Sequence, residues 1–329
     1  MTRARSVPTT ACGDLAVLTS ALHWMEVSRA IDDRLVSAYK QGRLRGRLLS
    51  GRGQEAIPVG AGLCLEAHDL VAPAHRDMGV HLIRGTTPFA IFAHYLGRAT
   101  GLSGGRDGDV HMGEWSRGVF PMVSHLPDSW PIAAGLALAQ KLRGEPGITM
   151  AFCGDGATST GTWHETVNFA AVNQLPMVLI VEDNQYAYST PTDAQYRCAT
   201  IVDRAVGYGI GGEGVDGNDV AEVHRVVRGA VDRARAGDGP TLVVAETMRM
   251  EGHAFHDAAT YVPDELLAGW AAKDPLERVK ARLRFVGWDE PRFAMVRDQI
   301  RAEVRSAWDQ AEAEPLPDGA DVATRVYAD

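Results

Sequence analysis

The sequence predicts an α/β fold in which helices flank a parallel β-sheet, with helical extensions at both ends of the chain. Short apolar runs at residues 148–153, 177–181 and 241–246 are separated by stretches with helical spacing. This alternation is typical of parallel strands joined by helical crossovers. A chain of 329 residues is also long enough to bury a large core between the sheet and its helices.

The composition argues against several classes of protein. A formal net charge of -9 is unfavourable for a broad nucleic-acid-binding face, although the basic stretch 43–52 could hold a small anion. No apolar run reaches the roughly 18 residues that span a bilayer, so we expect no membrane segment. The N-terminus, with Arg3 and Arg5, lacks the apolar stretch of a signal peptide. The four cysteines form no CxxC pair, which fits a reducing cytoplasm.

The N-terminal part is predicted to be mainly helical. A long amphipathic helix follows Asp14, which could cap it, because apolar residues recur at helical spacing as far as Leu35. The elements that follow are a helix after Gln54 and Glu55, a short strand at 69–72, a helix at 88–96 and a long loop at 101–118. Long loops inside compact domains are usually functional.

The rest of the chain alternates between helices and strands and then becomes helical. The remaining elements are helices at 131–142 and 163–172, a strand at 205–210 and a helix at 220–236. Beyond Pro263 only helical patterns remain. We therefore expect an N-terminal helical arm at 1–50, an α/β domain at 51–262 and a C-terminal helical region at 263–329.

Polar residues stand at the carboxyl ends of two predicted strands. Asp155 lies between Gly154 and Gly156 after the strand at 148–153, and Asn184 follows the next strand. Neighbouring strand ends lie about 4.8 Å apart, so a carboxylate and an amide oxygen could share one cation. Mg²⁺ prefers oxygen ligands and phosphate groups, which a glycine backbone can approach closely. A tight strand-to-helix turn without any ligand remains the alternative for these residues alone.

Motifs across most of residues 15–329 resemble those of one known family. They are Gly154-Asp155-Gly156-Ala157-Thr158, His164-Glu165, Asn168-Phe169-Ala170-Ala171, Asn184-Gln185-Tyr186-Ala187, Ser189-Thr190-Pro191-Thr192, Gln195-Tyr196-Arg197, Gly207-Tyr208-Gly209-Ile210 and Val215-Asp216-Gly217-Asn218-Asp219. Together they resemble the alpha subunit of the thiamine diphosphate-dependent first component of 2-oxo acid dehydrogenase complexes. The later segments are most similar to the branched-chain type, and the resemblance implies a thiamine diphosphate-binding fold.

The resemblance assigns roles to the strand-end residues. It implies that Asp155, Asn184 and the backbone carbonyl of Tyr186 bind Mg²⁺, while Gly156 and Ala157 line the diphosphate. The residue before the metal-binding asparagine is an aspartate here, where the family usually has a second asparagine. The ligand itself is retained, so the metal assignment stands.

Two further loops carry residues suited to an anionic cofactor. Arg76 follows the first predicted strand, and Arg249 and His253 follow the last one. Arginine suits a diphosphate, and histidine can exchange protons near neutral pH. A solvated arginine and a structural histidine are the alternatives from the residues alone. The resemblance implies that Arg76 and Arg249 contact the diphosphate, that His253 is the active-site histidine and that Asp257 orders its loop.

Some positions depart from the family pattern. His75 replaces a tyrosine that contacts the diphosphate in the family, and Ala254 replaces the serine that is phosphorylated in regulated members, which excludes kinase control there. Ser124 and Leu126 align with positions that contact the cofactor. The residues around them, at 125 and 127–130, differ from the family pattern. The sequence usual for the potassium site of branched-chain enzymes is therefore not found here.

The resemblance also implies partners. Thiamine diphosphate carries the decarboxylation chemistry and needs a glutamate to activate it. None is identifiable in this chain, and the resemblance implies that a separate beta subunit supplies it. The implied assembly is an α₂β₂ enzyme that decarboxylates a 2-oxo acid, with branched-chain substrates expected, and passes the acyl group to a lipoyl-bearing acyltransferase. The alternatives are the alpha subunit of a pyruvate or acetoin dehydrogenase and a non-catalytic subunit that has kept the fold.

Overall fold

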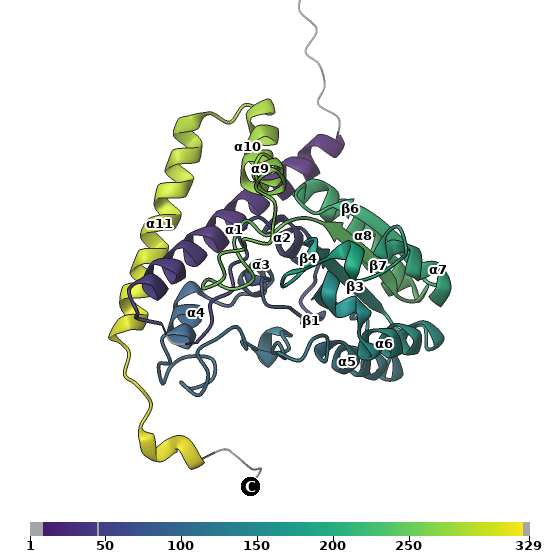
Figure 1. Ribbon diagram of the computed structural model, residues 1–329, viewed down its shortest axis with the longest axis horizontal. Coiled ribbons are helices and arrows are strands. Elements are labelled where there is room, and N and C mark those ends of the chain that lie inside the picture. Colours follow the sequence, from purple (N-terminus) through teal and green to yellow (C-terminus); the bar gives the residue numbers. More distant parts are fainter. Residues whose placement is uncertain (1–8, 45, 325–329) are drawn as a thin grey trace, which may run out of the picture.

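A five-stranded parallel sheet with strand order β1-β2-β3-β7-β6 forms the centre of the computed structural model, which describes residues 9–44 and 46–324 (Figure 1). The strands are β1 (Leu70–Ala72), β2 (Thr149–Gly154), β3 (Met177–Asp183), β6 (Gly211–Asp216) and β7 (Thr241–Glu246), and a two-stranded antiparallel hairpin comprises β4 (Tyr186–Ala187) and β5 (Thr190–Pro191). Every pairing in the large sheet is parallel. The predicted α/β fold with a parallel sheet flanked by helices is therefore confirmed.

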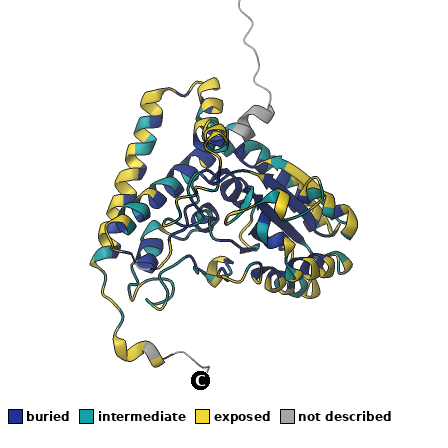
Figure 2. Ribbon diagram, viewed as in Figure 1, coloured by how far each residue is buried: buried dark blue, intermediate teal, exposed yellow. Residues whose placement is uncertain are grey.

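Helices cover both faces of the sheet, and further helices precede the first strand and follow the last one. They are α1 (Thr9–Lys40), α2 (Ala56–Gly62), α3 (Met78–Ile83), α4 (Pro88–Tyr95), α5 (Ser129–Arg143), α6 (Gly161–Val172), α7 (Arg204–Tyr208), α8 (Val220–Ala236), α9 (Asp264–Ala271), α10 (Pro275–Phe285) and α11 (Glu290–Ala313). Figure 2 shows that burial is concentrated in the strands and on the inward sides of these helices. No helix within the described ranges is long and apolar enough to cross a membrane.

The central strands are buried on both faces because their side chains alternate between two cores. In β2, Met150 and Phe152 join the core beneath α2 and α8, whereas Ala151 and Cys153 join the core beneath α5 and α6. A strand covered in this way has an almost continuous apolar sequence, which is the pattern seen in the chain. The helices cover the two faces of the sheet, whereas the carboxyl ends of the strands are followed by loops.

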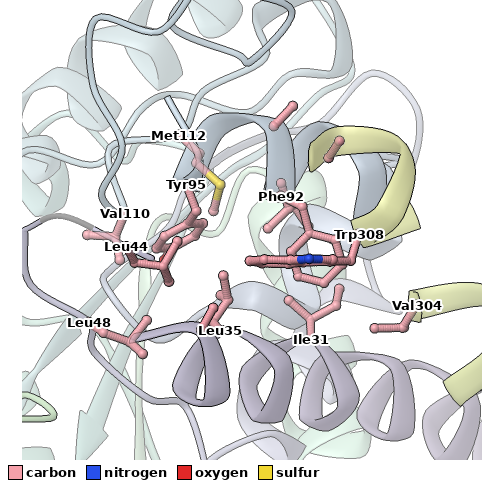
Figure 3. Close-up of a cluster of buried hydrophobic side chains, with 14 of the residues drawn as sticks. Ile31, Leu35, Leu44, Leu48, Phe92, Tyr95, Val110, Met112, Val304 and Trp308 are labelled. Carbon is pink, nitrogen blue, oxygen red and sulfur yellow. The ribbon is translucent and has the colours of Figure 1, made fainter. Parts of the chain in front are cut away.

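A third core joins the two ends of the chain. Ile31 and Leu35 of α1 pack with Phe92 of α4 and Trp308 of α11 (Figure 3). The Phe92 and Trp308 rings meet edge to face at 5.2 Å between centroids. The predicted helical extensions are thus packed against one another, and α1 is held rigidly on its apolar side.

Two predictions about elements were wrong. Residues 205–210 do not form a strand: α7 occupies most of them, and the strand β6 begins only at Gly211. A capping box of Thr200 and Asp203 initiates the turn before α7, and Gly209 ends the helix in a left-handed conformation. The first helix also begins at Thr9, upstream of Asp14, so Asp14 lies within the helix and does not cap its N-terminus. Arg3 and Arg5 lie outside the described residues.

Candidate active site

A cavity of about 350 Å³ lies at the carboxyl ends of β1, β2 and β3, beside the loop that follows β7. All of the residues predicted to bind the cofactor except Ser124 line it, namely His75, Arg76, Leu126, Asp155, Gly156, Ala157, Asn184, Tyr186, Arg249 and His253. Segments far apart in the sequence therefore meet in one place. Their meeting point is the edge of a parallel sheet at which ligands usually bind.

The register of the sheet explains why Asp155 and Asn184 are neighbours. Gly154 of β2 pairs with Glu182 of β3, so the two strands end side by side at the same edge of the sheet. Asp155 follows β2 directly, and Asn184 follows the last residue of β3. The predicted adjacency of the two strand ends is present in the structure.

Three oxygen atoms converge at this point. One terminal atom of the Asn184 amide lies 3.2 Å from Oδ1 of Asp155 and 3.1 Å from the carbonyl oxygen of Tyr186, and the other faces Gln54 at 3.3 Å. If the Asn184 atom that faces Asp155 and Tyr186 is nitrogen, the amide donates to both oxygens and no cation is needed. With oxygen in that position, three acceptors face one another, and a shared cation removes their repulsion. The donor set thus fits Mg²⁺.

The carboxylate of Asp155 is held in place by a neighbouring amide. Gln195 donates to Oδ2 of Asp155 at 2.7 Å and to the carbonyl of Thr190 at 2.9 Å, which leaves Oδ1 directed at Asn184. Burial raises the pKa of Asp155 above its usual range. A divalent cation at Oδ1 would offset this cost of burying the charge. No three His, Cys, Asp or Glu side chains of the described residues form a metal cluster, so a cation here needs the amide and carbonyl oxygens.

Gly156 is required by the close approach of the β4–β5 hairpin. A Cβ atom at this position would overlap the Cβ of Ala187, whereas a Cβ at Gly154 would meet nothing nearer than the carbonyl oxygen of Glu182 at 3.9 Å. The backbone after β2 can therefore lie directly against the hairpin that carries Tyr186.

We expect Gly156→Ala to destabilise the protein, because the added methyl group must displace the hairpin. Overpacking of this kind costs about 1 to 3 kcal/mol. Chemical denaturation of the purified variant measures this loss in the free energy of unfolding. Gly154→Ala is the matched control, since Gly154 has an ordinary φ of -83° and open space around its Cβ. Equal stability of the two variants would contradict the steric argument.

Two buried arginines point into the cavity. Arg76 donates from Nη1 to the carbonyl of Ser50 and from Nη2 to the carbonyl of His253 at 2.7 Å. Arg249 donates to the carbonyl of Tyr188 at 2.9 Å, and its buried Nε has no partner. Within the described ranges, neither guanidinium forms an ion pair with a carboxylate. Two unpaired buried cations are unfavourable unless an anion binds between them.

The two cavity histidines are neutral at physiological pH. Burial and the positive charge of Arg76 lower the pKa of His75 from 6.5 to about 3. Burial, Arg76 and Arg249 likewise lower the pKa of His253 to about 4. His253 stacks against Tyr188 at 4.5 Å between ring centroids. Each neutral imidazole offers one donor and one acceptor nitrogen to a ligand.

The loop that carries His253 is ordered by Asp257, the residue assigned that role from the sequence. Asp257 accepts from the backbone N–H of His253 at 2.8 Å and from the hydroxyl of Tyr261 at 2.6 Å. Ser124, in contrast, is exposed, and its hydroxyl bonds to His111, whose other ring nitrogen bonds to Asp107 at 2.8 Å. The structure does not bring the Ser124 side chain into the cavity.

Several lining residues were not predicted, among them Leu49, Glu182 and Tyr188. Glu182 could have been found, because it is a charged residue at the end of an otherwise apolar strand. Burial and the Asp77 carboxylate raise the pKa of Glu182 well above its usual range, which favours its neutral form. Leu49 and Tyr188 come from irregular segments whose position depends on tertiary contacts.

Comparison with known proteins agrees with the fold. The family model for the dehydrogenase E1 component matches residues 23–319. A 3-methyl-2-oxobutanoate dehydrogenase subunit alpha of Mycobacterium tuberculosis is 38% identical over 93% of this chain and 81% of its own length. A 2-oxoisovalerate dehydrogenase subunit alpha of Bacillus subtilis is 36% identical over 92% of this chain and 93% of its own. A pyruvate dehydrogenase E1 component subunit alpha of Rhizobium meliloti is 33% identical over 92% of this chain and 87% of its own length.

The chain belongs to the dehydrogenase E1 component family. Within it, the chain is an alpha subunit of the 2-oxo acid dehydrogenase type, and the branched-chain members are among its similar relatives. Membership implies thiamine diphosphate as the cofactor and a beta subunit as a partner in a larger complex. The converging oxygens, the buried arginines and the small residue at 156 fit the diphosphate end of that cofactor.

Proposed function

We propose that this chain holds Mg²⁺ and the diphosphate of thiamine diphosphate in a branched-chain 2-oxo acid dehydrogenase. The observation that carries the proposal is the pairing, in one cavity, of three convergent oxygens with two buried arginines that lack carboxylate partners. A cation alone would not need the arginines, and an anion alone would not need the oxygens. A metal diphosphate needs both.

Each residue has a distinct part in this proposal. Asp155, Asn184 and the Tyr186 carbonyl bind the metal, and the guanidinium groups of Arg76 and Arg249 bind diphosphate oxygens. The bound cofactor supplies an electron sink for the loss of CO₂. Gly156, Ala157 and Leu126 shape the wall, while His75 offers a neutral hydrogen-bonding group. Whether Ser124 takes part stays a prediction, because its side chain lies outside the cavity.

His253 is the proposed catalytic residue. It is neutral and half-buried, lies on a loop ordered by Asp257, and lines the same cavity as the diphosphate-binding groups. One of its ring nitrogens lies 3.4 Å from Nη1 of Arg249. The imidazole can therefore orient the carboxylate of a 2-oxo acid or move a proton when the acyl group is formed.

The partner must complete the active site. Among the described residues, the acidic side chains that line the cavity are Asp155 and Glu182, and both stand at strand ends beside the diphosphate-binding groups. Asp155 is assigned to the metal, and burial and Asp77 raise the pKa of Glu182 well above its usual range. We therefore propose an α₂β₂ enzyme in which the beta subunit supplies the activating glutamate, with a lipoyl acyltransferase as acyl acceptor. The unpaired Cys64, Cys153 and Cys198 fit the proposed cytoplasmic location.

The identity of the substrate rests on the relatives, two of which are named for branched-chain 2-oxo acids. Pyruvate and acetoin remain the alternatives, and a non-catalytic subunit is the third. Turnover of the reconstituted enzyme with 3-methyl-2-oxobutanoate, pyruvate and acetoin separates them. Reduction of an artificial electron acceptor is the common readout, because acetoin has no carboxylate to lose as CO₂. We expect the highest kcat/KM with 3-methyl-2-oxobutanoate, and absence of turnover with all three would favour a non-catalytic role.

Metal removal tests the proposal as a whole. We expect thiamine diphosphate to bind the reconstituted complex in the presence of Mg²⁺ and to bind at least ~100-fold more weakly after chelation, since a bridging cation neutralises the diphosphate at the carboxylate. Isothermal titration calorimetry measures both affinities. Binding that is equally tight with and without a chelator would contradict the metal site.

A further inference from the structure

We propose that Asp32, on helix α1, is a positioning residue that acts through Ser50 to hold Arg76 in its diphosphate-binding orientation. This inference rests on the proposed function of Arg76. Asp32 lies far from the strand ends in the sequence and does not line the cavity. Its effect on the cofactor would therefore be indirect.

Ser50 connects the two residues through two different atoms. Its hydroxyl donates to Oδ2 of Asp32, and its carbonyl oxygen accepts from Nη1 of Arg76. The backbone N–H of Arg52 donates to the same hydroxyl at 3.1 Å, so the serine side chain is bonded on both sides. All three residues of the chain of contacts, Asp32, Ser50 and Arg76, are buried.

The segment that carries Ser50 has no regular structure of its own. Residues 46–50 form neither helix nor strand, so their place depends on contacts with other elements. The backbone of the segment also lies directly on that of Arg76, since a Cβ at Gly51 would be 2.8 Å from the Arg76 carbonyl oxygen. A shift of Ser50 would thus move both the carbonyl that binds the guanidinium and the wall behind it.

Helix α1 is anchored in a hydrophobic core beside this contact. Ile31 and Leu35, one residue before and three residues after Asp32, are buried and pack with Phe92 and Trp308 (Figure 3). Side-chain packing therefore holds the helical turn that carries Asp32. The other terminal nitrogen of Arg76, Nη2, donates to the carbonyl of His253, so the guanidinium is held between the Ser50 and His253 segments.

A carboxyl group at this position is unfavourable for stability alone. Burial raises the pKa of Asp32 to about 7, against the opposing hydrogen bond from Ser50. Nearby Glu55 and Asp33 raise the pKa further, and Arg52 lowers it. Asp32 makes no ion pair with the described residues around it. An apolar residue would be cheaper to bury, which favours a role in placing Ser50.

The test compares three variants of the chain in complex with the beta subunit. We expect Asp32→Ala and Ser50→Ala to raise the Kd for thiamine diphosphate about 5- to 10-fold, the usual effect of losing one hydrogen bond. Asp32→Asn keeps an acceptor for the hydroxyl and should restore the affinity to within ~2-fold of the unmodified complex. Calorimetry at saturating Mg²⁺ gives the Kd, and kcat at saturating cofactor should stay unchanged.

Ser37→Ala is the matched control. Ser37 lies on the same helix, its hydroxyl accepts from the Gln41 amide at 3.3 Å, and it lines neither the cofactor cavity nor the small cavity beside Asp32 and Arg76. It should leave the Kd unchanged. Should Asp32→Ala fail to fold, Ser50→Ala decides alone.

The possible failures can be told apart. If Arg76→Gln weakens cofactor binding but Asp32→Ala and Ser50→Ala do not, the positioning inference is wrong and the proposed function stands. A lower melting temperature with an unchanged Kd, or an Asp32→Asn variant as weak as Asp32→Ala, also overturns it. If Arg76→Gln itself has no effect on the Kd, the proposed function of Arg76 is wrong.

Discussion

Replacing Asp155 with asparagine is expected to weaken thiamine diphosphate binding at least ~30-fold, about 2 kcal/mol, and to remove most of its dependence on Mg²⁺. The substitution keeps the shape of the side chain but removes its charge, and the single amide oxygen can either accept from Gln195 or face Asn184, but not both. The neutral amide oxygen is a weaker ligand for a hard cation. Calorimetric titrations of the reconstituted complex at several Mg²⁺ concentrations measure both effects.

Asp183→Asn provides the matched control. Asp183 is another buried aspartate at a strand end, next to the proposed ligand, but it does not line the cavity. Its side chain accepts from the backbone N–H and the side-chain amide of Gln185, both at 3.4 Å, and from the hydroxyl of Tyr196 at 3.5 Å. Equal losses of affinity in the two variants would mean that the charge of Asp155 has no special place in the site.

Arg249→Gln is expected to weaken cofactor binding about 10- to 100-fold, because a buried hydrogen bond to a charged group is worth about 1.5 to 3 kcal/mol. The same change should not destabilise the cofactor-free protein greatly. The unpaired, buried guanidinium is itself unfavourable there, and its Nε has no partner. Affinity by calorimetry and melting temperature without cofactor are the two measurements.

Arg84→Gln is the control for this prediction. Arg84 bonds to the main-chain carbonyls of residues 66, 67, 69 and 117 and does not line the cavity. We expect the opposite pattern, a lower melting temperature with an unchanged affinity. An Arg249 variant that behaves like the Arg84 variant would show that Arg249 serves the fold instead of the ligand.

The buried parts of the fold were predictable from sequence because their side chains obey simple periodicities. The helix α8 and the strand β7 have the predicted bounds, since one has a clear apolar stripe and the other a continuous apolar run between breakers. The error at 205–210 has a physical cause. A short apolar run fits a strand or a helix equally well, and the true strand β6 is glycine-rich and partly exposed at the sheet edge.

The site was predictable where residues stand at strand ends, because parallel topology brings those ends together. Asp155, Asn184 and Arg249 belong to this group. The contacts that orient them could not be predicted from local patterns. Gln195 reaches Asp155 from beyond the hairpin, and Ser50 reaches Arg76 across segments with no shared periodicity. Such contacts depend on tertiary packing, as does the exclusion of the Ser124 side chain from the cavity.

The measurement that tests the central claim most directly is the release of CO₂ from 3-methyl-2-oxobutanoate by each purified chain and by their mixture. Among the described residues, the acidic side chains that line the cavity are Asp155 and Glu182. The proposed function assigns Asp155 to the metal and the activating carboxylate to the partner. With Mg²⁺ and cofactor present, we predict turnover by the mixture of alpha and beta subunits and none by either chain alone. Sustained decarboxylation by this chain without a partner would contradict the claim that it supplies half of an active site.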